Sequence, residues 1–194
     1  TADPLIGLSP AGLPAVMGFN QRNQAGLSDI SPTAFLVPNL GPNWTVGLGS
    51  SVVLPAGDQA IGSGKVSAGP AFLAFHHRGP WIVGARMRNV WSLAGDPERD
   101  DINRLVVRGL LRYQLDRSWY LISSPLISSD WTQPEGKGWM VPVGGGVGRS
   151  FRLAGQPMQV SLEAYYNAVK PQFAGEELLG DWTVRTQWQV LFPN

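Results

Sequence analysis

The chain has 194 residues, of which 43% are hydrophobic and only 15% are charged, with a formal net charge of +1 at pH 7. A net charge this close to zero does not indicate binding to nucleic acid. The lack of cysteine excludes disulfides, thiolate metal sites and cysteine nucleophiles. No apolar run approaches the roughly 18 residues of a spanning helix, so a membrane crossing would have to use strands. Scarce charge, 24 glycines and 8 tryptophans are typical of a membrane barrel with tight turns and aromatic girdles.

The first 26 residues are rich in Pro, Gly, Asn and Gln without sustained periodicity, so residues 1–26 are interpreted as an irregular segment or outer loop. Residues 27–194 contain hydrophobic runs of about ten residues, close to what a tilted membrane strand requires and longer than most soluble strands. The predicted strands are 27–37, 44–54, 65–75, 81–93, 102–115, 119–129, 139–151, 158–168 and 181–192.

The gaps between these runs alternate in length. Short, turn-like gaps cover 38–43, 77–80, 116–118 and 152–157, and longer polar gaps cover 55–64, 94–101, 130–138 and 169–180. Short periplasmic turns alternating with longer outer loops are the pattern of an outer-membrane barrel. We therefore predict an all-β fold, a transmembrane antiparallel up-and-down β-barrel over residues 27–194.

Nine strands that begin at an outer loop cannot close an even-stranded barrel unless at least one more strand precedes them. We expect that strand to come from a start missing before Thr1, and not from residues 1–26. The chain also shows no signal peptide, which an outer-membrane protein needs for export, so we expect a processed or truncated start. The intact barrel should then have about 10–12 strands.

The last run shows the alternation of a strand most clearly. Trp182, Val184 and Trp188 fall on one face, and Arg185 and Gln187 fall on the other. A membrane barrel turns such an apolar face to lipid, whereas a soluble sandwich buries it in a core. Aromatic residues near both strand ends predict a girdle formed by Trp44, Trp81, Trp91, Trp119, Trp139, Tyr166, Trp182 and Trp188.

Arginines recur at every fourth position of the run 102–115, which places Arg104, Arg108 and Arg112 on one face. Facing lipid would cost about 2–4 kcal/mol for each at mid-depth, so we expect them to point into the lumen. The predicted lumen-lining residues are Arg86, Arg88, Arg104, Arg108, Arg112, Glu163 and Arg185. A basic lumen favours anionic solutes. The alternative is an internal salt-bridge network that plugs the barrel, with loop carboxylates such as Asp96 and Glu98 folding inward.

Other chemical signals are weak. The glycine-rich stretch 143–148 lies within a predicted strand, so we interpret it as a packing feature and not a phosphate loop. His76 and His77 lie at a short turn, away from the outer rim where a lipid-cleaving triad would sit. The acidic loop around Asp96 to Asp101 lacks the Asx-Gly pattern of a calcium loop. We predict no catalytic residue, no metal site and no cofactor.

Several segments resemble a known family. They include Gly-Pro-Trp-Ile-Val-Gly-Ala at 79–85, Asn-Val-Trp-Ser-Leu-Ala-Gly at 89–95 and Trp-Tyr-Leu-Ile-Ser-Ser-Pro at 119–125. Val-Gly-Gly-Gly-Val-Gly-Arg at 143–149 and the closing stretch at 181–193 add to them. Together they resemble the bacterial outer-membrane family "MetA-pathway of phenol degradation", often labelled transporter or "neuromedin U". The resemblance implies a barrel of about twelve strands, no established catalytic residues and a link to aromatic compounds.

These observations lead to two functional hypotheses. The first is an outer-membrane channel or transporter-like protein of a Gram-negative cell that passes small hydrophobic or anionic solutes, aromatic ones included, by passive diffusion. The second is a closed structural barrel that acts as an interaction partner, with its arginines paired internally. Neither is an enzyme. The expected partners are outer-membrane lipid and lipopolysaccharide, a small-molecule solute and a protein in a membrane complex, but not nucleic acid.

Overall fold

The computed structural model describes residues 29–56, 63–134, 137–173, 176–177 and 179–190. These residues form strands and connections, without a helix. The strands are β1 (Thr33–Leu36), β2 (Trp44–Val53), β3 (Lys65–Arg78), β4 (Trp81–Gly95), β5 (Asn103–Gln114), β6 (Trp119–Ser123), β7 (Leu126–Asp130), β8 (Trp139–Leu153), β9 (Gln156–Val169), β10 (Gln172–Phe173), β11 (Glu176–Glu177) and β12 (Trp182–Val190). The predicted segment 1–26 lies outside the described residues.

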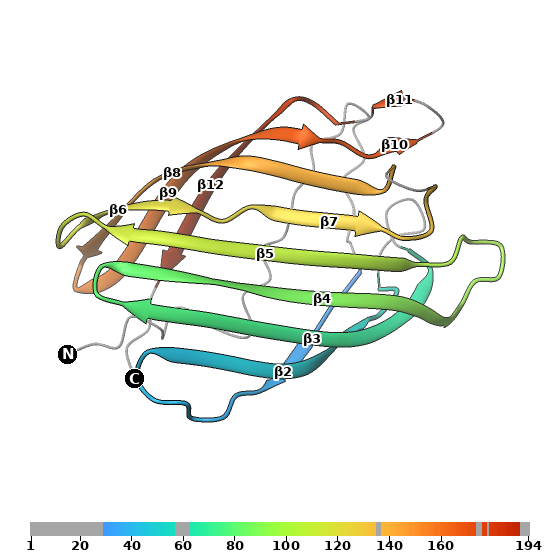
Figure 1. The fold of residues 1–194 in the computed structure, drawn as a ribbon, viewed down its shortest axis with the longest axis horizontal. Coiled ribbons are helices and arrows are strands. Elements are labelled where there is room, and N and C mark those ends of the chain that lie inside the picture. The colour runs from blue at the N-terminus through green and yellow to red at the C-terminus, as the bar shows by residue number, and fades with distance from the viewer. Residues whose placement is uncertain (1–28, 57–62, 135–136, 174–175, 178, 191–194) are drawn as a thin grey trace.

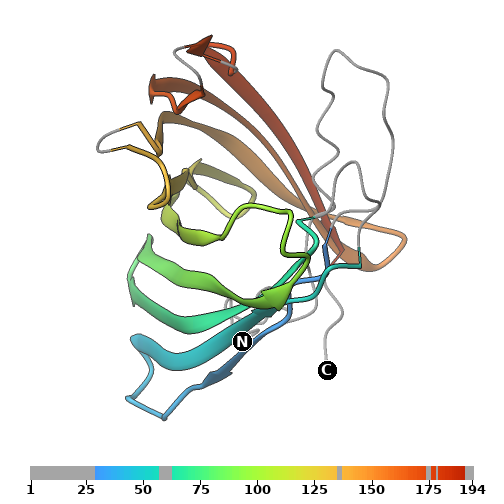
Figure 2. The same cartoon turned by 90° about the vertical axis from the view of Figure 1, so that its right-hand side faces the viewer.

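One antiparallel sheet contains all the long strands, in the order β1-β2-β3-β4-β5-β6-β8-β9-β12 (Figure 1). β7 continues the line of β6, pairing with both β5 and β8. Each strand therefore lies beside its neighbour in the chain, and Figure 2 shows the sheet bending round from the blue strands to red β12. This confirms the predicted all-β, up-and-down antiparallel fold as a barrel-like sheet. Within the described residues, β1 and β12 form its two edges and do not pair with each other.

The predicted strand 119–129 is wrong as a single element, because it is divided between β6 and β7 at Ser124 and Pro125. Proline has no N–H to donate to a neighbouring strand, so the ladder is interrupted there. The Pro125 carbonyl still accepts a hydrogen bond from the Gly109 N–H at 3.1 Å, which keeps the two halves in line.

The first predicted strand, 27–37, is also shorter than expected, since β1 covers only Thr33–Leu36. Pro32 and Pro38 flank it and remove the donors that would extend the ladder. Residues 27–28 of this prediction, and residues 191–192 of the last predicted strand, lie outside the described residues.

The predicted alternation of short and long connections is confirmed. Ala154 and Gly155 have positive φ angles of 50° and 83° and form a two-residue turn between β8 and β9. In the β5–β6 turn, the backbone N–H groups of Trp119 and Ser118 donate to the Asp116 carboxylate, which holds the pKa of Asp116 below its usual range. The β4–β5, β7–β8 and β9–β12 connections lie at the opposite end of the strands (Figure 1), and the last contains the β10–β11 pair.

The two faces of the sheet have an inverted polarity. Ser51, Ser67 and Glu163 have no exposed surface, and all three lie on the concave face of the sheet. Large apolar side chains alternate with them along the strands and stay exposed on the convex side. The outward apolar residues include Leu48, Leu111, Val143, Leu162, Val184 and Trp188. The core of this sheet is therefore polar, and its outer surface is apolar.

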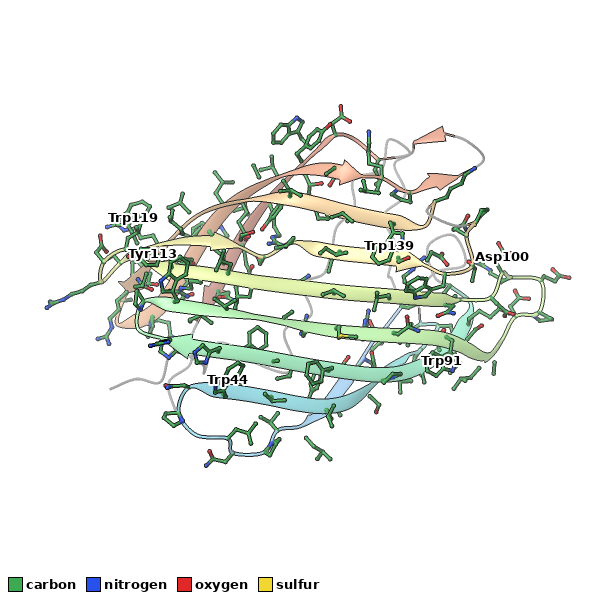
Figure 3. All side chains as sticks on the ribbon, viewed as in Figure 1. Trp44, Trp91, Asp100, Tyr113, Trp119 and Trp139 are labelled. Atoms are coloured by element: carbon green, nitrogen blue, oxygen red, sulfur yellow. The ribbon has the colours of Figure 1, made fainter. Side chains whose placement is uncertain are left out.

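Aromatic residues form two bands on the outer face, one near each end of the strands (Figure 3). Trp44, Tyr113 and Trp119 lie at the end with the short turns, and Trp91 and Trp139 lie at the end with the long loops. The Trp81 ring stacks near Tyr113, with 4.5 Å between ring centroids, and the Tyr166 and Trp182 rings lie 5.4 Å apart. Trp188 lies opposite Val160, on the line of paired residues that continues through Arg149 to Trp119. All eight predicted girdle positions therefore face outward.

The glycine-rich stretch of β8 is a packing feature, as predicted. Gly148 lies opposite Tyr120 on the neighbouring strand, and a Cβ atom at position 148 would overlap the Tyr120 ring. The missing side chain lets this ring lie flat against β8 on the concave side, where Tyr120 is buried.

The close fit of Gly148 against Tyr120 predicts that Gly148→Ala destabilises the sheet by about 1–3 kcal/mol, the usual cost of overpacking. The measurement is urea unfolding of the folded protein, followed by tryptophan fluorescence. Gly109→Ala is the matched control, because a Cβ there would meet Pro125 at an ordinary 3.4 Å. Equal stability of the two variants would contradict this account of Gly148.

Candidate functional site

The predicted lumen residues all lie on the concave face of the sheet. Arg86 lies directly opposite Arg108 in the β4–β5 register, and Arg185 lies directly opposite Glu163 in the β9–β12 register. Arg88 is two residues from Arg86 on β4, and Arg104 and Arg112 are each four residues from Arg108 on β5. Because side chains alternate between the faces of a strand, all of them share the same face. The structure thus brings together, on one face, seven residues that come from β4, β5, β9 and β12 and are spread from residue 86 to residue 185.

Glu163 is the most deeply buried charged group, with no exposed surface. The Arg185 Nη2 donates to Glu163 Oε2 at 2.8 Å, and Arg185 Nε donates to Oε1 at 3.3 Å. Tyr165 donates its hydroxyl to the same Oε2 at 2.5 Å, and Ser124 donates its hydroxyl at 2.8 Å. The carboxylate is therefore held by a charged guanidinium and two hydroxyls.

Ser124 completes this cluster from the break between β6 and β7. Its backbone N–H donates to Glu163 Oε2 at 3.2 Å, and its carbonyl accepts from Arg185 Nη2 at 2.8 Å. Arg185 also contacts the Ser124 hydroxyl. The cluster joins the strand interruption to β9 and β12, so backbone groups that the ladder releases at Pro125 are satisfied by side chains.

A second cluster surrounds Arg112. Its guanidinium lies 3.7 Å above the centre of the Tyr120 ring, within cation–π range. Arg112 also donates to Gln114 at 2.9 Å and to Gln159, across the concave side, at 3.3 Å. Arg112 is therefore held by neutral partners.

Two further arginines have a protein partner each. Arg88 donates to the Ser51 hydroxyl at 3.0 Å, and Arg104 lies 3.6 Å from the Asp130 carboxylate. The idea that Asp96 folds inward is wrong, because Asp96 accepts from the Glu98 N–H and lies 4.0 Å from Arg99 in its own loop. Asp130 takes the inward role, since β7 extends one residue beyond the predicted strand.

Arg86 and Arg108 differ from the other four arginines. Neither makes a hydrogen bond or an ion pair with any residue that the structure describes, and the Arg108 Nε is buried without a partner there. The inner face therefore contains some guanidinium groups with protein partners and two without.

The sequence reasoning missed Ser124 and Asp130 as partners of the arginines. The Ser-Pro dipeptide is a turn signal that could have indicated a strand interruption. Nothing in the local sequence indicates that Ser124 faces Glu163, which is 39 positions away.

The remaining candidates have ordinary surroundings. The His76 ring lies 4.3 Å from the Trp44 ring, and its Nδ1 lies 3.1 Å from the Asn43 carbonyl oxygen, at the end with the short turns. Within the described ranges, no group of three or more histidine or carboxylate side chains could hold a metal ion. None of the described residues belongs to a helix that could cross a membrane.

Comparisons with known proteins add no assignment. The chain matches no protein-family model, no curated protein and no solved structure.

The buried cluster predicts that Glu163→Gln destabilises the protein by about 3–5 kcal/mol, because Arg185 then keeps its charge without a counterion. Chemical unfolding of the variant and wild type measures this difference. Glu163→Gln/Arg185→Gln should lose less stability than the sum of the two single variants.

Asp130→Asn is the matched control for Glu163→Gln. It removes the same charge from an ion pair whose arginine side chain is 56% exposed, so it should cost about 1 kcal/mol or less. A Glu163→Gln variant as stable as Asp130→Asn would rule out a structural role for the buried pair.

Proposed function

We propose that this chain is an outer-membrane β-barrel protein of a Gram-negative cell that passes small hydrophobic or anionic solutes by passive diffusion. One observation carries the proposal: the sheet has Glu163 and the arginines of β4, β5 and β12 on the concave side, and a mostly apolar surface on the convex side. In water, such a fold would expose its apolar side chains and bury its charges, which is unfavourable on both counts. In lipid, the same arrangement is favourable.

The aromatic bands support the same environment. Tryptophan and tyrosine prefer the boundary between lipid and water, where an apolar ring and a polar N–H or O–H can both be accommodated. The two bands lie near the two ends of the strands. The exposed Leu48 and Leu162 lie in the middle of β2 and β9. Outer-membrane lipid and lipopolysaccharide are thus the proposed surroundings, and the resemblance to the phenol-degradation family agrees with this proposal.

The arginines supply the proposed mechanism of selection. Six of the predicted residues on the inner face are arginines, and Glu163 and Asp130 are the carboxylates that contact them among the described residues. An excess of positive charge within low-dielectric walls raises the local concentration of anions. Solutes would then diffuse along this face, because the sequence carries no motif for energy coupling.

A closed structural barrel is the second candidate, favoured by the partners of Arg88, Arg104, Arg112 and Arg185. Side chains held in this way fill space and do not move aside for a solute. In this case the protein would act as a scaffold for a partner in a membrane complex.

Membrane exposure of the convex face predicts that Leu48→Arg lowers stability in lipid vesicles by about 2–4 kcal/mol, because Leu48 lies in the middle of β2. Leu40→Arg is the control, since Leu40 lies in the β1–β2 connection and is similarly exposed, at 53% against 65% for Leu48. Unfolding by guanidinium in vesicles measures both. If Leu48→Arg were as stable as Leu40→Arg, the convex face would not contact lipid.

An open, basic lumen predicts anion-selective conductance in planar bilayers. In a salt gradient, the reversal potential of Arg108→Glu should show lower selectivity for anions over cations than that of the wild type. Arg117→Glu is the matched control, because it makes the same charge change in the exposed β5–β6 turn. Folded protein without conductance would favour the closed barrel and contradict the passage of solutes.

A further inference from the structure

Arg86 and Arg108 occupy an unusual position, since the two like charges lie directly opposite each other on neighbouring strands. Such a pair is destabilising, because side chains in register lie within about 5.5 Å at Cβ. Arg86 is exposed on the concave side, and Arg108 is half-buried beside it. The pair therefore concentrates two positive charges at one place near the middle of β4 and β5.

The hydrogen-bonding capacity of this pair is unused. Each guanidinium has five N–H donors, and the described residues provide no acceptor for either one. The contrast with Arg88, Arg112 and Arg185, each of which has a partner, shows that acceptors are available elsewhere on the same face. A half-buried charged donor such as Arg108 is costly without an acceptor, and a bound anion would remove that cost.

Apolar side chains flank the pair on the two neighbouring strands, while the charges of Arg185 and Glu163 also act on Arg108. Leu73 lies opposite Arg86 on β3, and Leu126 lies opposite Arg108 on β7, so the line of paired residues reads Leu73, Arg86, Arg108, Leu126. The next line on this face contains Phe75 and Leu110, with Gly84 between them. A Cβ at Gly84 would overlap the Phe75 ring, so the ring covers the glycine on the line next to the arginines.

We propose that Arg86 and Arg108 form a binding site for an organic anion that joins a carboxylate to an apolar body. The two guanidinium groups would each donate to the carboxylate, whose two oxygens match the planar fork of an arginine. Phe75, Leu73 and Leu110 would contact the apolar part. This inference rests on the proposed function, because the site would bind solutes as they pass along the inner face.

The test is equilibrium dialysis of radiolabelled hexanoate against the full chain folded in detergent, with empty micelles as the background. Hexanoate should bind saturably, and Arg86→Gln and Arg108→Gln should each weaken binding by at least about tenfold. Arg117→Gln is the control, because it removes the same charge from the exposed β5–β6 turn, and it should change the affinity by less than about twofold.

Acetate tests the apolar half of the site. It carries the same carboxylate, so it should bind at least about tenfold more weakly than hexanoate if Phe75 and the leucines contribute. Equal binding of acetate and hexanoate, or equal losses in Arg108→Gln and Arg117→Gln, would overturn the proposal. Heat-dependent mobility on gels shows that each variant is folded.

The dialysis result and bilayer conductance separate the two proposals. Arginine-dependent binding of hexanoate without conductance would support the site and reject passage through the barrel. Conductance, together with hexanoate binding that is unchanged in Arg86→Gln and Arg108→Gln, would support passage and reject the site.

Discussion

A buried pair of opposite charges, Glu163 on β9 and Arg185 on β12, ties these neighbouring strands to the break between β6 and β7 through Ser124. Glu163 has no exposed surface, so its charge must be neutralised within the protein. Arg185 from β12 provides the counterion, and Ser124 and Tyr165 provide hydroxyl donors. Because Ser124 lies at the break between β6 and β7, the same cluster satisfies backbone groups that Pro125 removes from the ladder. The concave side of the sheet is organised around this cluster.

The rest of the concave face follows from the same requirement that buried polar groups find partners. Arg112 rests on the Tyr120 ring, and that ring fits against β8 only because position 148 is glycine. Arg88 reaches across β3 to Ser51 on β2. Side chains from strands two or more apart therefore meet over the concave surface, as the curvature of the sheet requires.

Arg86 and Arg108 stand outside this pattern, because neither has a hydrogen-bond or ion-pair partner among the described residues. A wholly structural interior would be expected to pair its charges, since unpaired charges are costly in a low-dielectric environment. The combination of arginines that have protein partners and a pair without them is consistent with the proposed binding site. The convex face presents lipid-compatible side chains to its surroundings, which makes the proposed channel and the proposed site consistent with one another.

The sequence by itself determined the fold class, the strand alternation and the faces on which the arginines and aromatic residues lie. Period two allows this, because in a regular strand the position of a residue decides its face, as with Arg104, Arg108 and Arg112. Local sequence also explains the shortened β1, where prolines flank the strand. Only the tertiary structure decided which groups meet: Ser124 with Glu163, Asp130 with Arg104 and Gln159 with Arg112. These contacts depend on sheet register and curvature, and periodicity carries no information about how far one strand slides past the next.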